Sequence, residues 1–256
     1  MANPEHLARL QRDALQWAAW RLKNPAIAPD LSGANLQGMR LSGIDLAEAN
    51  LRAANLDNAI LDAANLSRAI FSKASLSGAT LVDANLQYAE VVVANLSTAD
   101  LRGADLRHAN LIGSDLRETN FKEADLSNAN LHQAELTGAH LYKTNFYQAN
   151  LTLAHLSGID GDAAIFNEAN LTAANLRWSR LKGAQFHWTL LRQANLSGSD
   201  LSQATFKAAD LKGVTLTAAR LVRTRFEQTN LEEAELAEVD LSRAIIEARV
   251  SEAIDL

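Results

Sequence analysis

The chain of 256 residues contains no cysteine, so neither a disulfide framework nor a thiolate metal site can form. Its three prolines all lie before residue 30, and aromatic residues make up only 5% of the chain. Because proline removes a backbone donor, the proline-free stretch that follows is compatible with continuous backbone pairing. The first residues lack the pattern of a secretory signal, and no apolar run reaches the length of a membrane span. We expect a soluble cytoplasmic protein with no membrane association.

Motifs of the common enzyme classes are also missing. The sequence has no G-x-S-x-G, P-loop, G-x-G-x-x-G or H-E-x-x-H pattern. Its six histidines do not recur in one register, which disfavours shared metal ligation. We therefore expect no enzymatic activity, no catalytic residues, no metal and no cofactor.

A strict five-residue pattern is present instead. From Leu31 to Ile246 every fifth position is apolar except Gly161, and Leu fills 34 of these 44 positions. A second column, two residues earlier in each five, holds Ala at 30 of 43 positions between Ala34 and Ala244. A period of five matches neither an α-helix nor a β-strand, so the chain must turn once in each repeat. We predict that both columns face inward and that the other residues face outward.

Glycine and phenylalanine indicate the turns and the size of the coil. Eleven of the twelve glycines lie two residues after the inward position, where a type II turn requires a positive φ. Five successive phenylalanines occupy inward positions at intervals of twenty residues: Phe146, Phe166, Phe186, Phe206 and Phe226. This spacing predicts a four-sided coil of twenty residues. It also predicts about eleven coils and a rod on the order of 50 Å long, at the ~4.8 Å spacing of β-pairing.

Three segments are predicted. Residues 1–29 are expected to form a capping helix and a linker, with the helix over residues 3–23, Asn3 as N-cap and Pro4 at its first position. Its apolar stripe is expected to comprise Leu7, Leu10, Ala14, Trp17 and Ala18, widened by Trp20 and Leu22. Residues 30–246 form the repeat array, and residues 247–256 form a short C-terminal cap. Such caps cover the terminal apolar layers that a solenoid exposes.

The repeat x-A-[N/D]-L-x, as in ADLRGADLRHANL at residues 99–111, resembles the pentapeptide-repeat family over about residues 30–246. The resemblance implies an all-β solenoid in the form of a right-handed quadrilateral β-helix, and only the resemblance implies the handedness. Some members of the family are structural or signalling proteins. Others mimic duplex DNA and act on type II topoisomerases. The repeat itself carries no activity, so it transfers none.

The net charge of −6 is distributed in bands. It is +2 in residues 1–29, −8 in residues 30–168, +7 in residues 169–226 and −7 in residues 227–256. A surface that mimics DNA should be negative along most of one side, so the basic band disfavours that function. The candidate interaction surface in the band comprises Arg177, Trp178, Arg180, Lys182, His187, Trp188 and Arg192.

Two interpretations of the basic band remain open. Outward tryptophans among cations suit binding of anions or nucleic acid. Alternatively, the twenty-residue period predicts a structural ladder of opposite charges on one side. We favour the structural ladder. The ladder would comprise Asp160, Arg180, Asp200, Arg220 and Asp240.

Two further departures from the repeat are candidate features. Val92, Val93 and Ile112 are predicted to form an exposed apolar strip, which on a monomer often marks a contact surface. Gly161 leaves an inward side chain missing. Either Ile159 and Ile165 fill this gap, or an acidic notch opens between Asp160 and Asp162.

The sequence favours a non-enzymatic rod that acts as a protein–protein interaction scaffold, with a partner it does not identify. One alternative is a DNA-mimicking modulator of a type II topoisomerase such as gyrase. Binding of nucleic acid or another anion through the basic band is the least favoured alternative. A monomer, a side-to-side dimer and a dimer formed through the C-terminal end are all compatible with the repeat pattern.

Overall fold

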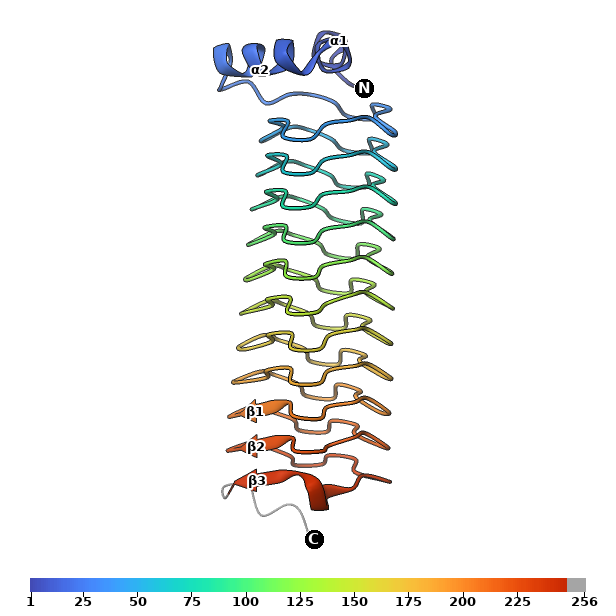
Figure 1. Cartoon of the computed structure of the whole chain (residues 1–256), viewed down its shortest axis with the longest axis vertical. Helices are drawn as coiled ribbons and strands as arrows, with labels where there is room; N and C mark the ends of the chain where they lie inside the picture. Colours follow the sequence, from blue (N-terminus) through green and yellow to red (C-terminus); the bar gives the residue numbers. More distant parts are fainter. Residues whose placement is uncertain (248–256) are drawn as a thin grey trace.

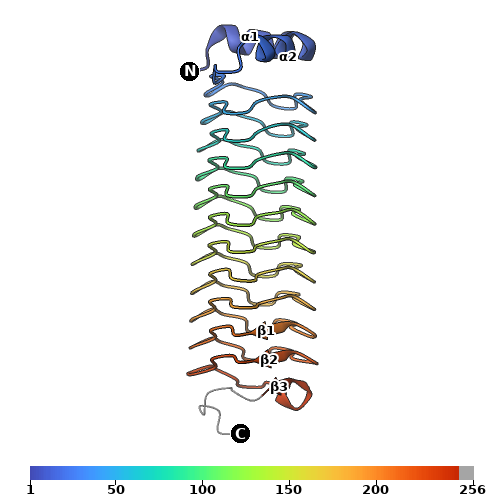
Figure 2. The ribbon, with the colours of Figure 1, turned by 90° about the vertical axis from the view of Figure 1, so that its left-hand side faces the viewer.

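A computed structural model describes residues 1–247, which form a straight stack of coils closed at its N-terminal end by two helices (Figures 1 and 2). Single-residue parallel bridges join each coil to the next, and the partner always lies twenty residues further on, from Asp30↔Asn50 to Thr215↔Glu235. A bridge occurs at every fifth residue, so each coil has four bridging positions. This register agrees with the four-sided, twenty-residue coil predicted from the phenylalanine spacing.

Within residues 1–247, regular strands occur only at the C-terminal end of the stack. Strands β1 (Thr205–Lys207), β2 (Arg225–Glu227) and β3 (Ile245–Glu247) form a parallel sheet in the order β1-β2-β3. A short 3-10 helix, η1 (Leu241–Arg243), precedes β3. The C-terminal cap predicted for residues 247–256 lies outside the described residues, apart from Glu247.

Every corner of the coil uses the same backbone conformation. In the first corner the Ala34 N–H donates to the Leu31 carbonyl at 3.0 Å, which closes a reverse turn. The third residue of the turn has a positive φ at every fifth position from Gly33 to Glu238, and 31 of these residues are not glycine. A left-handed conformation costs an L-residue about 1–2 kcal/mol, so pairing with neighbouring coils imposes it. The glycines marked the corners correctly, but they do not create them.

The predicted inward columns form one continuous core. The Leu, Phe and Ala side chains of both columns are almost completely buried between Leu31 and Leu231. The five phenylalanines stack along one side with ring centroids 4.7–5.1 Å apart. At most positions where serine or threonine replaces alanine, its hydroxyl donates to a carbonyl of the preceding coil, as in the 2.8 Å bond from Thr144 Oγ1 to Phe121 O; the buried hydroxyl of Thr229 has no such partner. These hydrogen bonds offset the cost of burying a hydroxyl.

Gly161 is buried, and neighbouring side chains fill the space. A Cβ atom built at Gly161 would lie 3.0 Å from Leu181 Cδ2 and 3.4 Å from Ile159 Cδ1. Packing by Ile159 agrees with the prediction. The second predicted partner is wrong, because Ile165 lies at an outward position and Leu181 of the next coil takes its place.

The N-terminal segment contains two helices, so the continuous helix predicted over residues 3–23 is wrong. Helices α1 (Pro4–Arg12) and α2 (Ala14–Lys23) are separated by Asp13, which is extended with φ −168°. Asn3 caps α1 as predicted, and the Asp13 carboxylate accepts from Leu15 N at 3.0 Å to cap α2. Figure 1 shows the two helices at an angle to each other across the end of the rod.

The break in the helix changes which side chains are buried. Leu10 and Trp17 are buried, and Trp17 Nε1 donates to Asp45 O at 2.8 Å. Nearby, the buried Arg21 donates through Nε to Asp45 Oδ2 at 3.0 Å. The predicted apolar stripe is therefore wrong in part. Its members Ala14, Ala18 and Leu22 are exposed, because the stripe required one uninterrupted helix.

Candidate interaction surfaces

The twenty-residue register sorts the outward residues onto four sides of the rod. We name each side by its inward residues: the first side follows Leu31, the second Leu36, the third Leu41 and the fourth Leu46, each repeated every twenty residues. The residue before each inward position and the two residues after it face outward, so every side presents three outward columns.

The basic band predicted from the sequence encircles the rod. The second side carries Arg177 and Trp178, the third Arg180 and Lys182, the fourth His187 and Trp188, and the first Arg192. No side holds more than two of these seven residues. The Trp178 ring lies over the backbone of Gly198 on the next coil, where an added Cβ would be 2.2 Å from ring atoms. A flat partner that contacts one side therefore meets only a fraction of the band.

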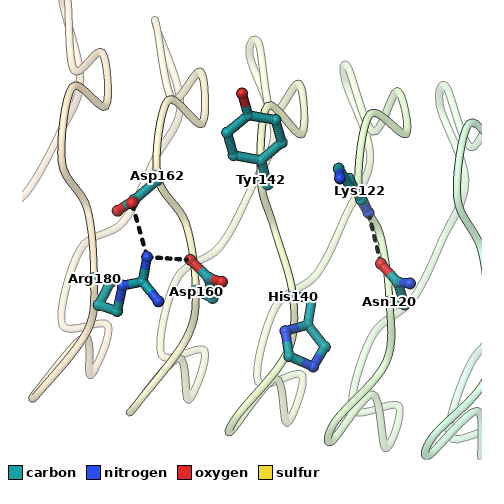
Figure 3. A pocket seen from close by; sticks show the side chains of 7 residues that line it. All are labelled: Asn120, Lys122, His140, Tyr142, Asp160, Asp162 and Arg180. Carbon is teal, nitrogen blue, oxygen red and sulfur yellow. Dashed lines mark hydrogen bonds and ion pairs between the residues drawn. The ribbon is translucent and has the colours of Figure 1, made fainter.

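The predicted charge ladder lies on the third side. Parallel bridges join Asp160 to Arg180, Arg180 to Asp200, and Asp200 to Arg220. Arg180 donates to Asp162 Oδ2 at 3.0 Å and lies 3.7 Å from Asp160 Oδ1 (Figure 3). The hydrogen bond to Asp162 and the charge of Asp160 raise the pKa of Arg180. The last predicted member, Asp240, instead caps η1 by accepting from Ser242 N at 3.0 Å.

A hollow of about 490 Å³ lies beside this ladder. Figure 3 shows two rows of side chains from successive coils, comprising Asn120, Lys122, His140, Tyr142, Asp160, Asp162 and Arg180. Lys122 Nζ lies 5.2 Å from the centroid of the Tyr142 ring, within cation–π distance. Because Arg180 engages both carboxylates, the hollow resembles a polar recognition surface more than a site for acid–base chemistry.

On the fourth side, His187 is held between coils. Its Nε2 atom lies 2.8 Å from Thr205 Oγ1, and its ring makes an edge contact with Trp188 at 6.0 Å. Burial and the nearby charge of Lys207 lower the pKa of His187. The positive charge of the band near neutral pH therefore comes from its arginines and lysine.

The predicted apolar strip is assembled on the first side. Val92 and Ile112 are half-buried on successive coils, and Val93 is 56% exposed. Further along the same side, Leu153 and Leu190 are 44% and 42% exposed, with coils that present Asn, His, Gln and Thr between them and the strip. We missed these two residues because they lie far from the valines in the sequence. Sorting the outward residues by the twenty-residue period would have found them.

Several carboxylates of the acidic segment are neutralised locally by arginine two residues later. The three pairs are Asp100–Arg102 at 2.7 Å, Asp105–Arg107 at 2.7 Å and Asp115–Arg117 at 2.5 Å. The hydrogen bond from Arg117 lowers the pKa of Asp115. Such local pairing reduces the negative field that a DNA-mimicking surface requires.

Within residues 1–247, no three histidine, aspartate or glutamate side chains cluster as metal ligands would. Neither α1 nor α2, nor any other helical segment of that range, is long and apolar enough to cross a bilayer.

Comparison with protein families identifies the repeat. The model of pentapeptide repeats matches eight copies. Together the matched segments cover residues 30–158, 169–207 and 209–247. This chain belongs to the pentapeptide-repeat family, as its sequence pattern indicated, and membership implies a right-handed β-helix solenoid. The unmatched residues between 158 and 169 include Gly161.

Several solved pentapeptide-repeat structures are similar to this chain. HetL, involved in heterocyst differentiation regulation in the cyanobacterium Nostoc sp. strain PCC 7120, is 29% identical; the match covers 89% of this chain and 95% of HetL, with a TM-score of 0.38. QnrB1, a plasmid-mediated fluoroquinolone resistance protein, is 17% identical over 73% of this chain and 93% of its own, with a TM-score of 0.33. A protein from the Arabidopsis thaliana thylakoid lumen is 29% identical over 47% and 70%, with a TM-score of 0.29. No curated protein sequence matches the chain.

Proposed function

We propose that this protein is a non-enzymatic rod that acts as a scaffold for binding another protein. The observation that carries the proposal is the contrast between its core and its sides. The inward columns are uniform and buried from Leu31 to Leu231, whereas the outward columns differ from side to side. Recognition therefore has to depend on the outward side chains.

The third side is the surface we propose for the partner. Between Asp160 and Arg220, the charge of the residue before each inward position alternates in sign from coil to coil. Arg180 and Lys182 are exposed beside the carboxylates of Asp160 and Asp162. An array of alternating charges selects a partner with the complementary order and repels one in the wrong register. Exposed ion pairs contribute little to stability, typically 0–1 kcal/mol each, so reversing them should alter binding without unfolding the rod.

The test begins with affinity capture of proteins from the native host by the immobilised full chain. Binding of each purified candidate is then measured for the wild type, for Arg180→Glu with Lys182→Glu, and for Arg177→Glu on the second side as a control from the same coil. We expect the double reversal to weaken binding at least about tenfold and the control to have no effect. A partner whose affinity is equal in all three proteins would contradict the proposed surface. Substrate turnover by the purified protein would contradict the non-enzymatic assignment.

A second candidate function is modulation of a type II topoisomerase by mimicry of DNA. The net charge of −8 in residues 30–168 favours it, whereas the local arginine pairs and the basic band oppose it. This function requires that the protein alters the supercoiling activity of gyrase when the two are mixed at nearly equal molar concentrations. Unchanged supercoiling would eliminate this candidate.

Binding of nucleic acid through the basic band is a third candidate, and its residues are divided among four sides. It requires retention on DNA or RNA that falls steeply with salt and is weakened by Arg180→Glu. Absence of retention at low salt would exclude it. The cytoplasmic location stays a prediction.

A further inference from the structure

The first side of the rod carries an uncharged region that has no counterpart on the other sides. None of its outward residues between Val92 and Leu190 is Asp, Glu, Lys or Arg. Over the same coils the second side carries Glu118, the third Asp162 and the fourth Arg107, among others. In a chain with 21% charged residues, one neutral side several coils long indicates a surface that is covered.

Several polar groups of this region are already paired within the chain. Asn150 Nδ2 donates to Asn130 Oδ1 at 3.0 Å, and Asn150 Oδ1 accepts from Thr152 N at 3.1 Å. His132 Nδ1 lies 2.6 Å from Thr152 Oγ1. A polar group that already has a hydrogen-bond partner can be covered by another protein surface without the penalty of a buried, unpaired donor or acceptor.

We propose that the first side is the interface of an antiparallel homodimer, in which two copies pack first side against first side about a two-fold axis. The extent of the neutral region places the axis at its centre, between the coils of Leu131 and Leu151. Such an axis sets each outward column opposite the same column of the other copy and pairs coils equidistant from the centre. The charged residues that bound the region, Glu90 and Arg192, set this centre.

Those charges are complementary under this symmetry. The coil of Val91 lies opposite the coil of Leu191, so Glu90 of one copy approaches Arg192 of the other from a neighbouring column. Within its own chain Arg192 also donates to Asp210, and Glu90 accepts from Asn110 Nδ2 at 2.9 Å. Further out, Arg52 lies opposite Glu232 in the same column. In the coil pair between them, Lys73 and Asp210 lie in columns at opposite edges of the side. Asp210 and Lys212 are engaged within their own chain, Asp210 by Arg192 and Lys212 by Glu232 at 3.2 Å and Glu233 at 3.4 Å.

The edge shared with the fourth side is also complementary. In the turn column of this edge, Tyr88 lies opposite Trp188, and these rings are 45% and 52% exposed. In the next coil pair toward the axis, His108 lies opposite Glu168. Exposed aromatic side chains that meet across an interface are common anchors of binding energy.

The area is sufficient for a specific dimer. From the coil of Leu51 to that of Leu231, a spacing of ~4.8 Å per coil gives a length of about 43 Å, and five extended residues give a width of about 16 Å. Two such sides together bury about 1,400 Å², within the ~1,200–2,000 Å² of stable interfaces. The rod is straight in both views, so two first sides can lie along each other over this length (Figures 1 and 2).

Sedimentation of the full chain tests the dimer. We expect a dimer for the wild type and a monomer for Leu153→Lys, which places two like charges one coil apart in the same column, close to the axis. The matched control is Thr98→Lys, which introduces the same charge at an exposed turn position of the second side. A wild type that is monomeric at about 100 μM would overturn the proposal, as would a dimer that Leu153→Lys leaves intact. The latter result would indicate contact through another surface, such as the C-terminal end.

Charge reversal tests the antiparallel arrangement. Glu90→Arg and Arg192→Glu should each weaken dimerisation at least about tenfold, because each places like charges opposite one another. The double variant should restore the dimer. Double reversal without restoration would exclude the proposed pairing of coils. Circular dichroism checks that each variant folds. The proposed partner surface lies on the third side, so the scaffold function can be tested separately even if no dimer forms.

Discussion

The stacked phenylalanines allow the contribution of aromatic stacking to be separated from the contribution of buried area. Phe186 lies between Phe166 and Phe206, with centroids 5.1 and 4.7 Å away and ring planes within 6° and 4° of parallel. Phe121 is equally buried in the same kind of inward position, but the next coils place Leu101 and Leu141 beside it. Leucine is the standard residue at these positions, so a Phe→Leu substitution preserves the coil in both places.

Phe186→Leu and Phe121→Leu remove similar apolar area, but only the first removes two aromatic contacts. Each stacked pair contributes about 0.5–1.5 kcal/mol beyond buried area, so Phe186→Leu should lower the free energy of unfolding by about 1–3 kcal/mol more than Phe121→Leu. Phe146 has one stacked neighbour, Phe166, and its replacement by leucine should give an intermediate loss.

Guanidinium unfolding followed by circular dichroism measures these differences. A solenoid can unfold in segments, so the comparison requires equal dependence of the unfolding free energy on denaturant in all variants. Equal losses for Phe186→Leu and Phe121→Leu would refute the reasoning. The phenylalanine column would then stabilise the rod only by filling space.

Three further outcomes are expected. Gly161→Leu restores the repeat pattern but should destabilise by about 1–3 kcal/mol in thermal unfolding, because Leu181 occupies the space; a gain in stability would show an unfilled cavity. Thr98→Asn should stabilise by about 0.5–1 kcal/mol, because a β-branched residue at φ 59° is strained and Asn tolerates this conformation. The reciprocal Asn128→Thr should destabilise, and no effect of either change would refute the strain. The pKa of His187 is lowered in the folded protein, so folding favours the neutral ring. The contribution of His187 to stability is therefore present above about pH 6.5. It is lost at lower pH, where the unfolded chain takes up a proton. His187→Gln should therefore lose less melting temperature than wild type between pH 7.5 and 5.5, and identical losses would contradict this role.

Local sequence signals predicted the repeat well and the ends of the rod poorly. The inward columns could be predicted because each repeat buries the same two positions, so the pattern is renewed every five residues. The break at Asp13 could not be read in this way. Residues 3–23 have helical spacing on both sides of it, and the contact of Trp17 with Asp45 O that accompanies the break is made with a residue 28 positions later.

The candidate surfaces show the same division. The basic band was continuous in the sequence, yet successive repeats face different directions, so its residues are divided among four sides. The apolar strip was predicted from Val92, Val93 and Ile112, but the place of Leu153 and Leu190 on the same side depended on the twenty-residue register. Neighbours on successive coils of this rod are twenty residues apart in the sequence, and a local motif spans fewer residues than that.

The sequence by itself determined the five-residue period, the inward columns and the twenty-residue coil, because Leu, Phe and Ala recur at the positions that are buried in every repeat. The tertiary structure decided what only contact between coils controls. It imposes a left-handed corner on 31 residues that are not glycine, and it fills the space at Gly161 with Leu181. In both cases the backbone of one coil is held by the coil beside it, so the outcome depends on the stack and not on the individual residue.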